Sequence, residues 1–95
     1  MGLESVVAGA CELAEALARL TALGVTWTIV MVDGALVMPG MKVPERWVDV
    51  SVKTDAGTFA IKRRSDDSVA VIAFGNADEN AKQMQDRIAA ALRGE

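Results

Sequence analysis

The chain has no histidine and no tyrosine, and its only cysteine is Cys11. Histidine is the most frequent general base and a common metal ligand, so its absence removes most routine catalytic and zinc sites. A single cysteine also excludes an internal disulfide. Gly34, Gly40, Gly57 and Gly75 each stand singly at an expected turn, and no glycine-rich loop that would hold phosphates opens a helix. We therefore expect a protein that is not an enzyme and binds no metal ion or cofactor.

Aromatic side chains are scarce as well, at 4% of 95 residues, although 52% of the chain is hydrophobic. Aliphatic side chains must therefore fill the interior of a single domain, residues 1–95. The longest apolar stretch, residues 25–41, is interrupted by Asp-Gly and Pro-Gly pairs and is too short to span a membrane. The start of the chain lacks the basic segment of a secretory signal. The expected location is cytoplasmic.

Charge argues against a nucleic-acid partner. Ten basic and thirteen acidic residues leave a net charge of −3, whereas nonspecific nucleic-acid binding needs a cationic surface. The one basic cluster, which the expected strands bring close to Trp47, consists of Lys53, Lys62, Arg63 and Arg64. Because aspartates flank these residues, we interpret the cluster as a solvated hairpin rather than a phosphate-binding surface.

Each end of the chain has the hydrophobic periodicity of an amphipathic helix. Apolar residues recur at spacings of three and four over residues 3–23, and Gly24 follows as a C-terminal cap. The second helix is expected to begin at Asn76, with an acidic residue three positions later, and to end at Gly94. Cys11 would then lie in the middle of the first helix, as a small apolar side chain with no base to activate it.

The segment after the first helix predicts a β-hairpin. Two apolar runs, residues 25–32, which are rich in β-branched side chains, and residues 35–38, flank an Asp-Gly pair, whose residues suit a tight turn that needs positive φ. The expected cross-strand pairs are Met31 with Leu36 and Ile29 with Met38.

A three-stranded meander is expected next, over residues 46–53, 58–64 and 69–74. In its first hairpin, one register satisfies hydrophobic, ionic and cation–π pairs together. Those pairs are Val50 with Ile61, Asp49 with Lys62 and Trp47 with Arg64. The second hairpin would then pair Ile61 with Ile72 and Phe59 with Phe74.

The order helix, hairpin, meander, helix indicates an α+β fold. We expect two layers, an antiparallel sheet of about five strands with helices on one face. The other face of this sheet would also be partly apolar. Its expected residues are Val30, Val32, Val37, Trp47, Ala60, Val69, Val71 and Ala73.

An exposed apolar sheet face is typical of a surface that binds a partner. We therefore expect a noncatalytic interaction module that forms a homodimer through this face, although one helix on each face would bury the same residues within a monomer. The alternative is a small-molecule binding protein with an apolar pocket. Its expected lining residues are Trp27, Met38 and Met41.

Overall fold

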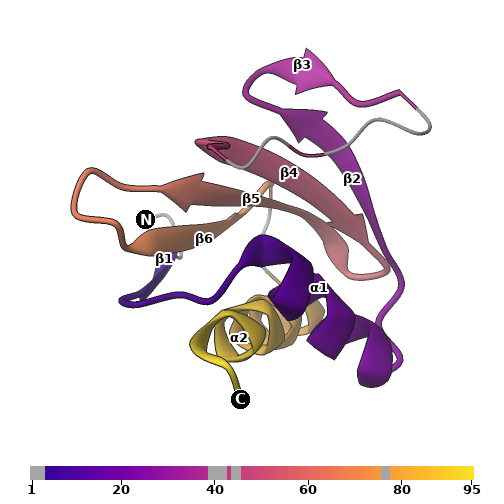
Figure 1. Ribbon diagram of the computed structural model, residues 1–95. Helices are drawn as coiled ribbons and strands as arrows, with labels where there is room; N and C mark the ends of the chain where they lie inside the picture. The colour runs from indigo at the N-terminus through magenta and orange to yellow at the C-terminus, as the bar shows by residue number, and fades with distance from the viewer. Residues whose placement is uncertain (1–3, 39–42, 44–45, 76–77) are drawn as a thin grey trace.

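The computed structural model shows one antiparallel sheet with both helices on the same face (Figure 1). It describes residues 4–38, 43, 46–75 and 78–95. The elements are β1 (Glu4–Val7), α1 (Leu13–Ala22), β2 (Trp27–Val32), β3 (Ala35–Leu36), β4 (Asp49–Thr54), β5 (Gly57–Arg63), β6 (Val69–Ala73) and α2 (Glu79–Arg93). The six strands are ordered β1-β6-β5-β4-β2-β3. This is the predicted α+β fold, with one strand more than expected.

The additional strand, β1, replaces the first part of the predicted N-terminal helix. It pairs with β6 in the register Glu4↔Ile72 to Val7↔Val69. Gly9 then adopts a φ of 66°, which no residue inside a right-handed helix has, and α1 begins only at Leu13. The prediction failed because a few apolar residues fit a strand as well as a helix, and pairing with a distant strand decides between them.

The C-terminal helix agrees better with the sequence. Asp78 is the N-cap of α2, and its Oδ1 accepts a hydrogen bond from the Ala81 amide at 2.8 Å. The predicted start, Asn76, lies outside the described residues. The helix ends at Gly94, as predicted, and Gly94 adopts the left-handed conformation.

The hairpin of β4 and β5 has the predicted register. Val50 pairs with Ile61, and both side chains are buried beneath the helices. Asp49 pairs with Lys62, whose Nζ lies 4.0 Å from Asp49 Oδ2. Burial and charge therefore act together here, since a slip by one residue would bury the ion pair and expose the valine and isoleucine.

The next hairpin is offset by one residue from the prediction. Ile61 pairs with Val71 instead of Ile72, and Phe59 pairs with Ala73 instead of Phe74. Since side chains alternate along a strand, this offset turns the whole of β6 over.

The offset arises in the β5–β6 turn, which spans residues 64–68 rather than the predicted 65–68. The longer turn is accommodated by Asp67, which adopts a positive φ of 65°. Asp66 holds the turn, because its Oδ1 accepts hydrogen bonds from the Ser68 hydroxyl at 2.6 Å and the Ser68 amide at 3.1 Å. Aspartate and serine are common turn residues, but the sequence does not show how many residues the turn takes.

A β-bulge interrupts β2. Opposite β4, the register runs from Ile29↔Val52 directly to Met31↔Ser51, so that Val30 has no partner in β4. The bulge places Val32 opposite Val50 and therefore on the helix side of the sheet. The predicted pair of Met31 and Leu36 is present. Because β3 ends at Leu36, the predicted pair of Ile29 and Met38 is not part of the ladder.

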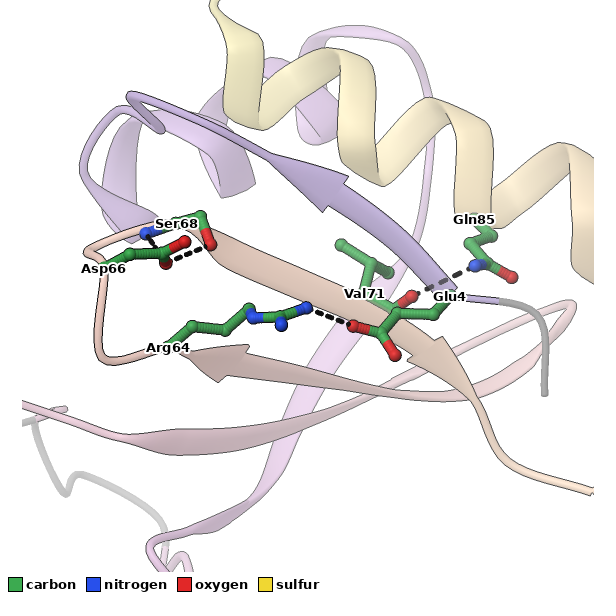
Figure 2. Close-up of polar contacts among 6 residues, drawn as sticks. All are labelled: Glu4, Arg64, Asp66, Ser68, Val71 and Gln85. Atoms are coloured by element: carbon green, nitrogen blue, oxygen red, sulfur yellow. Dashed lines mark hydrogen bonds and ion pairs between the residues drawn. The ribbon is translucent and has the colours of Figure 1, made fainter.

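The core lies between the helices and one sheet face. Its largest fully buried side chains are Val7, Leu20, Val50, Val52, Phe59, Ile61, Val71, Ile88 and Leu92. Full burial of each such side chain contributes on the order of 1.5–3 kcal/mol. Gln85 of α2 is buried with them and donates a hydrogen bond to the Val71 carbonyl at 3.0 Å (Figure 2). It donates a second hydrogen bond to the Ser5 hydroxyl at 3.2 Å. Gln85 thus joins α2 to β6 and β1.

Candidate interaction surface

The sheet face opposite the helices, which we call the open face, carries three rows of side chains that cross the strands. The central row is Glu4, Ile72, Ala60, Ser51, Met31 and Leu36. The Asp49 row on one side of it is Val6, Ala70, Lys62 and Asp49. The Lys53 row on the other side is Phe74, Thr58, Lys53 and Thr28. Phe74 follows the end of β6 and belongs to this row because its amide donates a hydrogen bond to the Thr58 carbonyl at 3.0 Å.

The open face has a floor of small side chains with larger apolar ones around it. Ala60 lies at the centre of the sheet and is 1% exposed, and Ala70 and Ser51 beside it are also buried. Leu36 and Phe74 stand out into solvent, with 73% and 55% of their surface exposed. Such large exposed apolar side chains around a shallow floor are typical of a surface that packs against another protein.

Charges of both signs lie among these apolar residues. Arg64 Nη1 lies 3.0 Å from Glu4 Oε1 across β6, as Figure 2 shows. Lys62 and Asp49 form the longer contact of 4.0 Å. In the described part of the chain, Lys53 has no ion-pair partner. Exposed pairs of this kind contribute little to the stability of a folded chain.

The structure changes which residues form the second sheet face. Of the predicted dimer-face residues, only Ala60 lies on the open face. The one-residue offset of β6 and the bulge of β2 account for the difference in the strands. The residues in the core or packed against it, on the helix side, are Val32, Val37, Trp47, Val69, Val71 and Ala73, and Val30 lies at the bulge.

Trp47 shows the same change in detail. Its ring contacts Arg63 rather than the predicted Arg64, with the guanidinium carbon 4.6 Å from the ring centroid. Arg63 pairs with Val69 in the ladder and so belongs to the helix side, whereas Arg64 reaches Glu4 on the open face. The basic cluster predicted from the sequence is therefore divided between the two faces of the sheet.

The predicted apolar pocket is only partly within the described residues. Trp27 is half-buried against the core, and its Nε1 donates a hydrogen bond to Thr21 Oγ1 of α1 at 2.8 Å. Met38 is exposed beyond the end of β3, and Met41 lies outside the described residues. A hollow of about 270 Å³ lies elsewhere, between α2 and the β4–β5 turn. Its lining residues are Gly24, Val25, Asp55, Ala56, Asn80, Gln83, Met84 and Arg87.

Cys11 lies before α1 and not in the middle of a helix, as the sequence had suggested. The Cys11 amide donates to the Leu92 carbonyl at 2.8 Å, near the end of α2. Arg19 Nη1 donates both to Cys11 Sγ and to the Ala91 carbonyl, each at 3.1 Å. These contacts bring donors to carbonyls in the last turn of α2, where the hydrogen bonds of the helix interior are missing, which gives Cys11 and Arg19 a structural role.

Asp33 joins the β2–β3 turn to the start of β4, a role that the sequence did not reveal. Its Oδ1 accepts hydrogen bonds from the amides of Val48 and Asp49 at 2.8 and 2.9 Å. The Asp33 amide donates in return to the Asp49 carbonyl at 2.7 Å. The hydrogen bond from the Asp49 amide, followed by that from Val48, lowers the pKa of the Asp33 carboxyl below its ordinary value.

Asp66 is a second aspartate held by its own turn. The hydrogen bonds from Ser68, first from its hydroxyl and then from its amide, lower the pKa of the Asp66 carboxyl. Across the described ranges, no three acidic or cysteine side chains come together as metal ligands would. Neither described helix has the length and apolar character needed to cross a membrane. The described polar clusters thus hold turns and helix ends.

A comparison of the chain with protein-family models, curated proteins and solved structures gave no match. The open face, with its exposed apolar side chains and mixed charges, is the feature on which a functional proposal can be built.

Proposed function

We propose that this protein is a noncatalytic interaction module that acts as a homodimer through the open face. The observation that carries the proposal is the exposure of Leu36 and Phe74 beside the half-buried Ile72 and Met31. A soluble domain gains free energy when such a surface leaves water, on the order of 25 cal/mol for each Å² of apolar area. Packing against another protein would supply that gain.

Charge balance favours a second copy of the chain over a strongly charged partner. The open face carries Glu4 and Asp49 together with Lys53, Lys62 and Arg64, so both signs are present in similar number. A nucleic acid would need a face of one sign. A twofold dimer instead brings a patch against itself, and a patch with both signs can then pair its own cations with its own anions.

A noncatalytic role rests on the chemistry of the side chains. The chain has no histidine, and the carboxylates of Asp33, Asp66 and Asp78 accept hydrogen bonds from backbone amides and, for Asp66, from the Ser68 hydroxyl. Cys11 contacts Arg19 and the end of α2. Each of these groups has a structural task, and none is paired with a base as a nucleophile requires.

Sedimentation velocity at micromolar concentration tests the homodimer. We expect the wild-type chain to sediment as a dimer and both Leu36→Ser and Phe74→Ser to shift it toward a monomer with an unchanged circular dichroism spectrum. Leu23→Ser is the matched control, because the exposure of Leu23 lies between those of Leu36 and Phe74 but Leu23 follows α1 on the helix side. A wild-type monomer, or a dimer that neither open-face substitution weakens, would overturn the proposal.

Small-molecule binding is a second candidate, favoured by the hollow of about 270 Å³ beside α2. Its volume is close to the lower end of the range for ligand pockets. Val25 and Met84 supply apolar lining, and Asp55 and Arg87 supply charges of opposite sign. A thermal-shift screen of small polar compounds tests this candidate, with Arg87→Ala as the variant that should abolish any shift. A shift that persists in Arg87→Ala would locate the ligand elsewhere, including the Trp27, Met38 and Met41 pocket predicted from the sequence.

A further inference from the structure

We infer that the two copies dock with their twofold axis along the central row, so that Asp49 of each copy faces Lys53 of the other. This inference rests on the proposed homodimer and adds its register and the residues that determine self-recognition. The argument uses the positions of side chains on β4 and β6.

On β4, Asp49 and Lys53 lie two positions before and after Ser51. All three side chains point to the open face, because side chains alternate along a strand, and neighbours on one face are about 7 Å apart. When two sheets pack face to face, the twofold axis lies in the plane between them. An axis that crosses the strands at Ser51 then brings the Asp49 end of one β4 over the Lys53 end of the other. Each dimer would contain this ion pair twice.

On β6, the same axis matches side chains by size. Ala70, Ile72 and Phe74 follow one another at every second position, with Ile72 in the central row. Rotation about that row places the exposed ring of Phe74 over the small, buried Ala70 of the partner subunit. Large side chains packing against small ones give the interdigitation that sheet packing requires. Charge on β4 and shape on β6 therefore favour one and the same axis.

An axis parallel to the strands, between β4 and β5, fits less well. It would set Lys62 against Asp49 of the partner subunit, which is also a pair of opposite charges. It would however leave Lys53 opposite Thr58 of the partner subunit, whereas Lys62 already lies 4.0 Å from Asp49 within its own chain. Among the described residues Lys53 has no ion-pair partner in its own chain, and only the axis along the central row gives it a carboxylate. The position of Lys53 therefore distinguishes the two axes.

The partners of Asp49 and Lys53 within one chain are consistent with this register. Among the described residues Lys53 has no ion-pair partner, and Asp49 meets Lys62 only at 4.0 Å. The Asp49 side chain is 41% exposed, so an ammonium group from a second copy would give this carboxylate a closer cation.

A charge exchange tests the register. Asp49→Lys sets two lysines against each other, and Lys53→Glu sets two carboxylates against each other. We expect each variant alone to weaken homodimerisation by about tenfold or more, since like charges at an interface oppose association. A one-to-one mixture of the two variants should dimerise again. In the heterodimer the lysine introduced by Asp49→Lys meets the glutamate introduced by Lys53→Glu, and the remaining Lys53 meets the remaining Asp49. Sedimentation velocity measures all three samples, and Arg87→Glu on α2 is the matched charge reversal that should leave the dimer intact.

The outcomes separate this inference from the proposed function. A wild-type monomer would overturn the homodimer and this register with it. A wild-type dimer that tolerates both single variants, or a mixture that stays monomeric, would overturn the register and leave the homodimer standing. Recovery by mixing Asp49→Lys with Lys62→Glu instead would assign the axis parallel to the strands. Should Asp49→Lys fail to fold, Asp49→Asn replaces it, since its mixture with Lys53→Glu still forms one Asp49–Lys53 pair and should dimerise better than Lys53→Glu alone.

Discussion

Arg19 of α1 donates a hydrogen bond from Nη1 to the Ala91 carbonyl of α2 at 3.1 Å, and so ties the end of one helix to the side of the other. The same nitrogen contacts Cys11 Sγ, and Arg19 Nη2 lies 3.8 Å from Glu15 Oε2. A cation at a helix C-terminus also interacts favourably with the helix dipole. The packing of the two helices therefore depends on a polar contact as well as on the apolar core.

Arg19→Met should lower the free energy of unfolding by about 1 kcal/mol, the usual net value of one such hydrogen bond. Urea denaturation followed by circular dichroism measures it. Cys11→Ala keeps the hydrogen bond from Arg19 to the Ala91 carbonyl and should lower the free energy of unfolding by less. Arg87→Met, on the exposed side of α2, should leave the free energy of unfolding almost unchanged. Equal stability of Arg19→Met and wild type would show that water replaces the contact without loss.

The stability of the protein should fall in acid partly through Asp33. Its pKa in the folded protein is lowered from the ordinary value of 3.8 by the amides of Asp49 and Val48. The unfolded chain therefore binds this proton at a higher pH than the folded protein does. The stabilising contribution is complete above the unfolded pKa and is lost as the pH falls through the folded pKa.

Asp33→Asn should accordingly reduce the acid dependence of the urea midpoint, and Asp33→Ala should lower the midpoint at neutral pH as well. Asp55→Asn, in the exposed β4–β5 turn, is the control for removing a negative charge. An acid dependence that is identical in wild type and Asp33→Asn would contradict the proposed role of this carboxylate.

Gly9→Ala distinguishes the observed N-terminal strand from the helix that the sequence predicted. In a helix this substitution would stabilise the protein by up to about 1 kcal/mol. At a φ of 66° it should instead destabilise by about 1 kcal/mol, because the left-handed conformation is unfavourable for alanine. No atom lies within 4 Å of the added Cβ, so the effect would be conformational rather than steric. Thermal unfolding gives the sign directly, and a raised melting temperature would support the helix.

The register of β6 predicts opposite effects at two neighbouring positions. Val71→Asp should prevent folding, because Val71 is 0% exposed in the core and a buried unpaired charge costs several kcal/mol. Ile72→Asp should leave a folded chain that no longer dimerises, since Ile72 lies on the open face. Circular dichroism and sedimentation together measure both effects. A folded Val71→Asp beside an unfolded Ile72→Asp would restore the register predicted from the sequence.

Local signals sufficed for several parts of the fold. The Asp-Gly turn predicted the pairing of Met31 with Leu36, and matched charges and valines predicted the register of β4 against β5. Gly94 predicted the end of α2. In each case the deciding interaction joins residues that lie close together in the chain, or opposite each other across one short turn, so its pattern is visible in the sequence.

The candidate site depended on features that such patterns do not contain. The length of the β5–β6 turn, held by Asp66, decided that Val71 is a core residue and Ile72 a surface residue. The bulge of β2 moved Val32 to the helix side in the same way. Periodicity predicts that alternate residues share a face, but a single added residue exchanges the two faces.

The sequence by itself determined the α+β class, the hairpins and the lack of histidine-based chemistry, because composition and short-range periodicity carry that information. Only the tertiary structure decided that residues 4–7 form a strand that pairs with β6, and that Cys11 contacts Arg19 and the end of α2. It also decided which side chains line the open face. These relationships join segments far apart in the chain. Their free energy comes from ladder hydrogen bonds and shared burial that exist only once the segments have met.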